Sequence, residues 1–133
     1  MYLLCQSKKL GIINASAVAM GLLTTAGPPA WHPASTETKE LARKAASLAK
    51  ERGTTIEDIA LQFSLSPPYE CIATTLVAMP TREILKQNLA AAIKPLKPTD
   101  MNTYNDFRAV FGNRNHHWIG SEVEQMRREL QNN

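Results

Sequence analysis

Two short apolar segments, each followed by a small-residue turn and a helical pattern, limit the possible folds of this chain more than any other feature. They span residues 11–16 and 71–78. Both runs are continuous rather than alternating, which is typical of strands buried on both faces of a parallel sheet. The order strand, helix, helix, strand, helix predicts parallel pairing through right-handed crossovers. Such a pair cannot bury both of its faces alone, so the pattern predicts more strands, in a missing part of the same chain or in a partner chain at the sheet edge.

Helical patterns fill the space between and after the predicted strands. A first helix follows Ser35, a residue type that favours the N-cap position. A second opens with Thr54 and Glu57 in the spacing of a capping box, and a third follows Pro80-Thr81. The apolar positions expected to face inward are Ile56, Ile59, Ala60 and Phe63 on the second helix and Ile84, Leu85, Leu89 and Ile93 on the third.

The part of the chain after the third predicted helix has a weaker pattern. Residues 99–120 show no clear periodicity and are predicted to be irregular, and a capped amphipathic helix is expected to close the chain. His116 and His117 are expected to form a solvated loop pair, because a zinc site needs three or four ligands and no acidic or cysteine cluster accompanies them. His32 is expected to pack within its own loop. The sequence therefore predicts no metal site.

Composition and charge exclude several classes of protein. The chain has 133 residues, of which 44% are hydrophobic, as in a packed domain. Its net charge is only +3, and its basic residues occur as pairs such as Lys8-Lys9 rather than as blocks. Aromatic residues make up 6% of the chain and do not alternate with the basic ones, so the sequence does not predict a nucleic-acid partner.

The cysteines and the longest uncharged run indicate the compartment. Cys5 and Cys71 lack the spacing of a metal site, which favours a reduced, intracellular protein. Residues 10–23 carry no charge, but the apolar run is shorter than the roughly 18 residues of a membrane span and is interrupted by Asn14 and Gly21. We therefore expect a cytoplasmic protein without a membrane partner.

Four motifs, in order and with sensible spacing, resemble the C-terminal part of the aldo-keto reductases, and within that family the L-galactose dehydrogenase branch. They are residues 13–24 (Ile-Asn-Ala-Ser-Ala-Val-Ala-Met-Gly-Leu-Leu-Thr), 27–35 (Gly-Pro-Pro-Ala-Trp-His-Pro-Ala-Ser), 60–65 (Ala-Leu-Gln-Phe-Ser-Leu) and 74–79 (Thr-Thr-Leu-Val-Ala-Met). The resemblance covers about residues 7–93 and implies an α/β fold, a helix-rich part of a (β/α)₈ TIM barrel with about its last two strands. Residues 1–98 would be this barrel portion, and residues 99–133 the irregular segment with the closing helix.

The resemblance also implies a cofactor site, for NAD or NADP. The residues that match cofactor contacts are Ser16, Val18, Met20 and Gly21 after the first strand and Met79, Thr81, Gln87 and Asn88 after the second. Small residues and exposed amides in a turn let a diphosphate approach closely, and the Gln-Asn pair matches the adenine contact. Ala15 stands where many relatives have an aromatic residue that stacks on nicotinamide. NAD is favoured over NADP, because Ala78 and Met79 carry no charge and only Arg82 could hold a further phosphate.

The family's reaction is hydride transfer between the nicotinamide cofactor and a sugar or aldehyde carbonyl or the corresponding alcohol. Its catalytic Asp, Tyr, Lys and His match no position here, so no catalytic residue is assigned and the chain alone, interpreted as a fragment, is expected to be inactive. Trp118 is the candidate contact for a small carbonyl or sugar substrate. An alternative hypothesis stays open: a non-catalytic remnant of the barrel that binds a nucleotide or pairs with a protein through its sheet edge.

Overall fold

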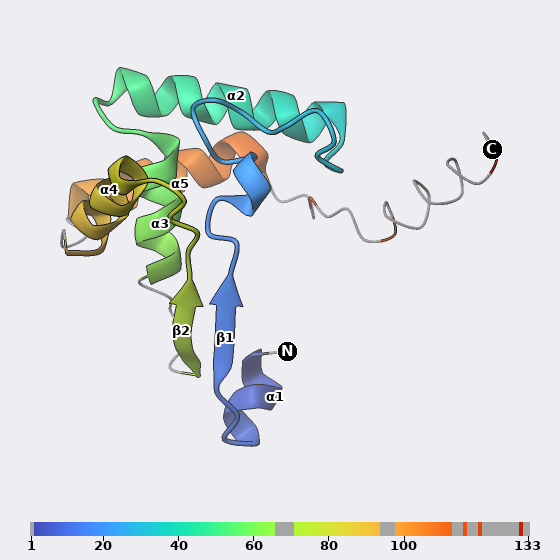
Figure 1. The fold of residues 1–133 in the computed structure, drawn as a ribbon, viewed down its shortest axis with the longest axis vertical. Coiled ribbons are helices and arrows are strands. Elements are labelled where there is room, and N and C mark those ends of the chain that lie inside the picture. The colour runs from blue at the N-terminus through green and yellow to red at the C-terminus, as the bar shows by residue number, and fades with distance from the viewer. Residues whose placement is uncertain are drawn as a thin grey trace.

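The computed structural model describes residues 2–65, 71–93 and 98–112, together with residues 116, 120 and 131. Its elements follow one another in the order strand, helix, helix, strand, helix that the sequence predicts, with a helix added at each end. They are α1 (Tyr2–Ser7), β1 (Ile12–Ala15), the short 3₁₀ helix η1 (Ala19–Gly21), α2 (Thr36–Glu51), α3 (Ile56–Leu65), β2 (Ile72–Leu76), α4 (Arg82–Ile93) and α5 (Pro98–Phe111). Figure 1 shows α2 to α5 gathered around the carboxyl ends of the strands, with α1 at the opposite end of the sheet.

The sheet of the described residues consists of β1 and β2, which pair in parallel. Ile12 lies opposite Ile72 and Ala15 opposite Leu76, with an irregularity in the register after Ile12. Because the strands are parallel and end opposite one another, the turns that follow them start from the same edge of the sheet (Figure 1).

One face of this sheet is covered by α3 and the other is open. On the covered face, the Thr75 hydroxyl donates a hydrogen bond to the carbonyl of Ser64 over 2.9 Å. On the open face, Ile13 is 65% exposed and Leu76 is 58% exposed. The apolar runs predicted strands buried on both faces, and within the described residues only one face has its cover. The open face is the one that further strands of a barrel would enclose.

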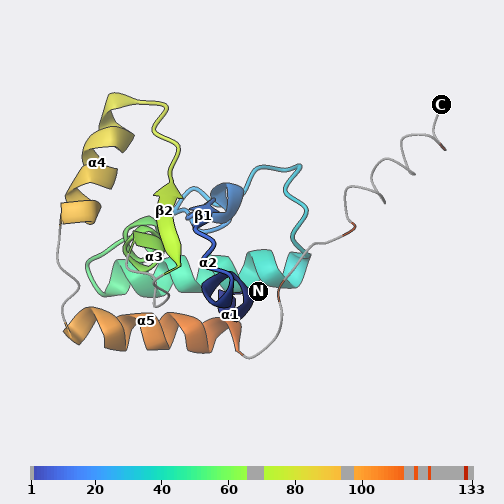
Figure 2. The ribbon, with the colours of Figure 1, turned by 90° about the horizontal axis from the view of Figure 1, so that it is seen from below.

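The core lies on the buried side of α2. Ser35 is the N-cap of this helix, as predicted, and its hydroxyl accepts a hydrogen bond from the amide of Thr38 over 3.1 Å. Ala45 and Ala49 are fully buried and form one cluster with Ile56 of α3 and Phe107 of α5, whereas Ala42 contributes to a second cluster. Small alanine side chains allow the neighbouring elements to approach α2 closely, and α5 runs alongside it (Figure 2).

Helix α5 corrects the prediction that the chain is irregular from residue 99. The structure has a 14-residue helix from Pro98 to Phe111. Proline suits the first turn of a helix because the amide it lacks has no partner there. Phe107 is buried, and Val110 and Phe111 pack against the same cluster, which places three apolar residues at helical spacing. The predicted closing helix lies outside the described residues.

The start of α3 also differs from the prediction. The helix begins at Ile56, and the hydroxyl of Thr55, not of Thr54, accepts the amide of Asp58 over 3.2 Å. The carboxylate of Glu57 does not close a capping box, because it accepts hydrogen bonds from Thr25 instead. A contact between residues distant in sequence thus replaces the local one.

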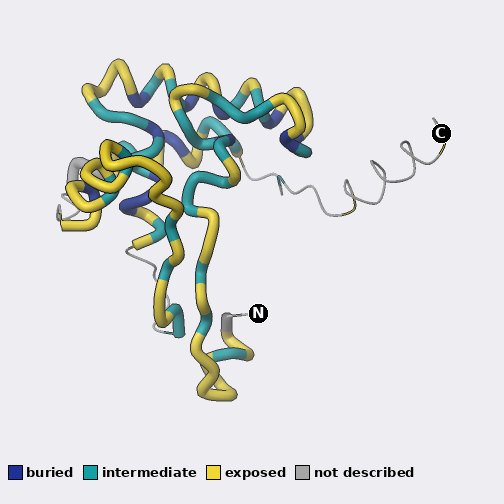
Figure 3. The backbone as a smooth tube through the Cα atoms, in the orientation of Figure 1, coloured by how far each residue is buried: buried dark blue, intermediate teal, exposed yellow. Residues whose placement is uncertain are grey.

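The predicted inward faces of α3 and α4 are only partly correct. Ile56 and Ala60 are buried as expected, but Phe63 is 44% exposed and stacks on Tyr104 with ring centroids 4.6 Å apart. On α4, Ala91 is buried, whereas the predicted inward residues Leu85, Leu89 and Ile93 are exposed. Figure 3 shows that much of this helix is exposed. Among the described elements α4 packs mainly against α3, which leaves much of this helix exposed.

Because α5 supplies the largest side chain of the main cluster, we expect Phe107→Ala to lower the free energy of unfolding by about 3–5 kcal/mol. Urea denaturation followed by circular dichroism measures this change. The matched control is Arg108→Ala, an exposed position of the same helix, which should change stability by less than about 0.5 kcal/mol. Equal effects of the two substitutions would contradict the placement of α5 in the core.

Candidate functional site

The turn after β1 has an unusual backbone. Ser16, Ala19 and Met20 have positive φ angles of 60°, 48° and 55°, and Gly21 follows with 92°. The left-handed conformation costs roughly 1–2 kcal/mol for each residue other than glycine. Residues 19–21 therefore form a strained turn that the surrounding structure must hold in place.

His32 and Thr24 hold this turn through its carbonyl groups. The His32 ring is 3% exposed, as its predicted packing requires, and its Nε2 lies 2.9 Å from the carbonyl oxygen of Ala19. Its Nδ1 accepts the amide of Ala34 over 3.1 Å, so Nδ1 carries no proton and Nε2 is the donor toward Ala19. The hydroxyl of Thr24 donates to the carbonyl of Gly21 over 2.8 Å.

The amide groups of the same turn are in part available to a ligand. Gly21 donates its amide to the carbonyl of Val18 over 3.1 Å, and Ala19 donates to Ser16 over 2.7 Å. The amides of Ala17, Val18 and Met20 have no acceptor among the described residues. Successive amides in a turn of mixed handedness form a concave site for an anion.

Gly21 and Ser16 have conformational roles in this turn. At a φ of 92°, a Cβ atom on Gly21 would also lie 3.4 Å from Cδ of Pro29, so glycine fits both the backbone and the space. Ser16 is exposed at the strand end, where its carbonyl accepts the amide of Ala19. Its side chain therefore lies at the surface of the turn rather than in the core.

The loop that follows the turn is fixed to α3. The carboxylate of Glu57 accepts the amide of Thr25 over 2.6 Å and its hydroxyl over 2.9 Å. This two-point contact joins the loop after β1 to the first turn of a helix 32 residues away. No local pattern in the sequence indicates this contact, apart from the presence of a carboxylate at the helix start.

The turn after β2 begins α4. The hydroxyl of Thr81 accepts the amide of Ile84 over 3.2 Å, which makes Thr81 the N-cap of the helix. Met79 and Gln87 are exposed, and the Asn88 side chain donates to the carbonyl of Ala78 over 3.4 Å. Asn88 thus fixes the turn to its helix, while the side chain of Gln87 is available to a ligand.

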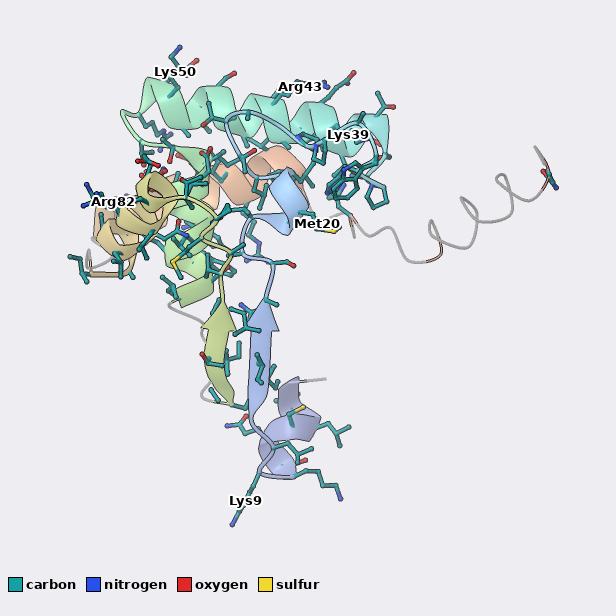
Figure 4. The ribbon with its side chains drawn as sticks, viewed as in Figure 1. Lys9, Met20, Lys39, Arg43, Lys50 and Arg82 are labelled. Atoms are coloured by element: carbon teal, nitrogen blue, oxygen red, sulfur yellow. The ribbon has the colours of Figure 1, made fainter. Side chains whose placement is uncertain are left out.

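The pairing of the strands brings these predicted residues to one end of the sheet. Since Ala15 lies opposite Leu76, residues 16–21 and 79–81 leave the sheet side by side. Figure 4 shows Met20 and Arg82 on the elements beyond this edge, whereas Lys9 lies at the opposite end. The edge combines backbone amides, the N-terminus of α4 and a small exposed residue, Ala15, which is an arrangement suited to a phosphorylated ligand.

His116 differs from its predicted role as a solvated loop residue. Its Nδ1 lies 3.0 Å from the hydroxyl of Thr38, and its Nε2 lies 2.9 Å from the carbonyl of Phe111. Its ring also meets that of Phe111 edge-on, with centroids 5.8 Å apart. His116 therefore joins the start of α2 to the end of α5. His117 and the predicted substrate contact Trp118 lie outside the described residues.

The part of the chain that the structure describes has neither a candidate metal centre nor a helix that could span a membrane. No three His, Cys, Asp or Glu side chains gather there in a way that would hold a metal ion. In the same part, every helix is too short or too polar to cross a membrane. Cys5 and Cys71 are both half-buried and are not joined by a disulfide bond.

Comparison with known proteins identifies the class. A sequence model of the aldo/keto reductase family matches residues 1–109, and the chain belongs to this family of oxidoreductases. Its β1–β2 pair and helices are accordingly part of a (β/α)₈ barrel. The chain is similar to L-galactose dehydrogenase of Arabidopsis thaliana, with 44% identity over 86 residues. These residues make up 65% of this chain and 26% of the relative, so the match spans about a quarter of the relative's length.

Since Glu57 is the link between the loop and α3, we expect Glu57→Ala to lower the free energy of unfolding by about 1 kcal/mol, for the loss of two hydrogen bonds at a partly exposed carboxylate. Thermal denaturation measures the loss. Glu51→Ala, which removes an exposed carboxylate from the end of α2, is the control and should have little effect. If both variants unfold at the same temperature as the unmodified chain, the contact does not hold the loop.

Proposed function

We propose that the carboxyl edge of β1 and β2 binds a nicotinamide dinucleotide, as part of an aldo-keto reductase of the L-galactose dehydrogenase type. The observation that carries this proposal is the parallel register, which sets the turn of residues 16–21 beside the turn of residues 79–81. A dinucleotide has a diphosphate at its centre and adenine at one end. It therefore needs two kinds of contact close together at one edge.

In this proposal, the amides of Val18 and Met20 and the hydroxyl of Ser16 bind the diphosphate. Gly21 supplies the left-handed turn that exposes these amides. Met79 and Thr81 line the second turn, and Gln87 on α4 contacts adenine. Asn88 contributes there while it fixes the carbonyl of Ala78. Backbone amides suit a diphosphate because they add no charge that would have to be desolvated.

The second turn favours NAD over NADP in this proposal. The 2′-phosphate of NADP requires a cation, and Ala78 and Met79 are uncharged. Arg82 at the start of α4 is the nearest basic residue in sequence and is exposed to solvent. An exposed arginine attracts a phosphate only weakly at physiological salt. NADP would therefore bind less tightly than NAD.

In the whole enzyme, the bound cofactor would exchange a hydride with L-galactose or a related sugar or aldehyde. Trp118 is our candidate for a substrate contact. A tyrosine hydroxyl would transfer the proton, and we place it outside these 133 residues, with the rest of the catalytic group. Tyr104 is not a candidate, because no position of this chain matches the family's catalytic tyrosine; its ring stacks on Phe63 of α3. This chain would contribute cofactor binding without turnover of its own.

The test is the stability of the chain with and without cofactor. Binding to the folded form alone raises the free energy of unfolding by about 2.7 kcal/mol at a concentration 100 times the dissociation constant. We expect NAD to raise the urea midpoint, and NADP to do so only at higher concentration. A folded chain whose midpoint is the same with and without both nucleotides would contradict the proposal.

Two glycines at positive φ provide matched variants for this test. Gly21→Ala and Gly53→Ala each place a side chain on a left-handed backbone, at 92° and 69°, and each should cost about 1 kcal/mol of stability or more. Gly53 lies after α2, away from the strand ends. The proposal requires that Gly21→Ala weaken NAD binding and that Gly53→Ala leave it unchanged.

A second candidate function follows from the open face of the sheet, where Ile13 and Leu76 are exposed. A chain that binds a nucleotide at the strand ends without catalysis would use this open face or the strand edge to pair with another protein. The two hypotheses share the cofactor site and differ in turnover. NAD-dependent oxidation of L-galactose by the protein isolated from its source would support the enzyme, and nucleotide binding without oxidation would support the interaction module.

A further inference from the structure

The buried ring of His32 controls the direction of one peptide group in the candidate site. With Nδ1 engaged by the amide of Ala34, its Nε2 donates to the carbonyl of Ala19 over 2.9 Å. The same carbonyl also accepts the amide of Leu22 over 3.1 Å. Both donors draw the carbonyl of Ala19 toward the protein interior, where Leu22 and Ala34 are buried.

The geometry of the peptide bond carries this direction to the next residue. In a planar trans peptide, the carbonyl of one residue and the amide of the next point in opposite directions. The peptide bond between Ala19 and Met20 is trans. Since the carbonyl of Ala19 points inward to His32, the amide of Met20 points outward. It has no acceptor among the described residues, and Met20 is exposed.

We propose that His32 is a positioning residue for the dinucleotide. Its ring holds the Ala19–Met20 peptide plane so that the amide of Met20 faces the diphosphate. This inference rests on the proposed function. His32 touches no ligand itself. It acts by opposing the strain of two successive left-handed residues, Ala19 and Met20.

The surroundings of the ring suit this role. Trp31 stacks on His32 with centroids 6.2 Å apart and planes inclined by 22°, and the His32 ring is buried. The hydrogen bond from Ala34, which directly precedes the N-cap Ser35, ties the ring to the start of α2. The orientation of the Met20 amide is thus tied to the N-terminus of α2, the helix whose buried alanines contribute to both core clusters.

Two isosteric substitutions separate positioning from packing. In His32→Gln, the side-chain nitrogen replaces Nε2 and keeps the donor to Ala19. In His32→Asn, the side-chain oxygen replaces Nδ1 and keeps the acceptor for Ala34, but the donor to Ala19 is lost. The probes are ADP and adenosine, which share adenine and differ in the diphosphate, and titration calorimetry gives their affinities.

We expect His32→Asn to bind ADP about tenfold more weakly than the unmodified chain, and His32→Gln to stay within about threefold. Adenosine affinity should be the same in all three chains. Equal ADP affinity in His32→Asn and the unmodified chain would overturn the positioning role. So would an equal loss of ADP and adenosine binding, because that result indicates a general structural defect.

Hydrogen exchange of the unmodified chain gives a second test, which needs no variant to fold. The amide of Met20 should exchange quickly in the free chain and slowly with ADP bound, while that of Gly21 is protected in both. A Met20 amide that is already protected without ADP would overturn the inference alone. Failure of the unmodified chain to bind ADP, NAD or NADP would instead remove the proposed function, and the inference with it.

Discussion

The register in which β1 pairs with β2 is the constraint on which the rest of the structure depends. Parallel strands need a long crossover, and here the loop after β1, α2 and α3 supply it. A slip of β1 by one residue relative to β2 would turn Asn14 away from Thr75, from the face covered by α3 to the open face. The register also sets which residues begin the two turns. It therefore determines both the candidate cofactor site and the packing of the crossover.

The core and the candidate site share one helix. The buried alanines of α2 pack on Ile56 and Phe107 in one cluster, and on Leu22 and Ala34 in the other. The second cluster contains Leu22, the residue after the strained turn, and so packs this turn against α2. The hydrogen bond from His32 to Ala19 holds the backbone of the turn. The buried packing of this chain therefore lies next to the strained turn. The open sheet face and the outer side of α4 have no cover among the described elements.

Local signals could be predicted from the sequence, and contacts between distant residues could not. Ser35 caps α2 as expected, because an N-cap depends only on the next three residues. The exposure of Leu89 was not predictable, since the helical pattern does not reveal which neighbours are present. The spacing of Thr54 and Glu57 predicts a local capping box, but the carboxylate of Glu57 accepts hydrogen bonds from Thr25 instead. The residues of the candidate turn came from the family resemblance, whereas the bond from His32 to Ala19 has no local signature.

The central claim is that the two turns act together as one dinucleotide site. Backbone amide chemical shifts of the ¹⁵N-labelled chain, recorded during titration with NAD, test it most directly. If the two turns form one site, the amides of Ala17, Val18 and Met20 shift together with those of Met79 and residues 81–88, and the amides of α1, at the opposite end of the sheet, do not. Shifts confined to one turn, or spread over α1 as well, would contradict it.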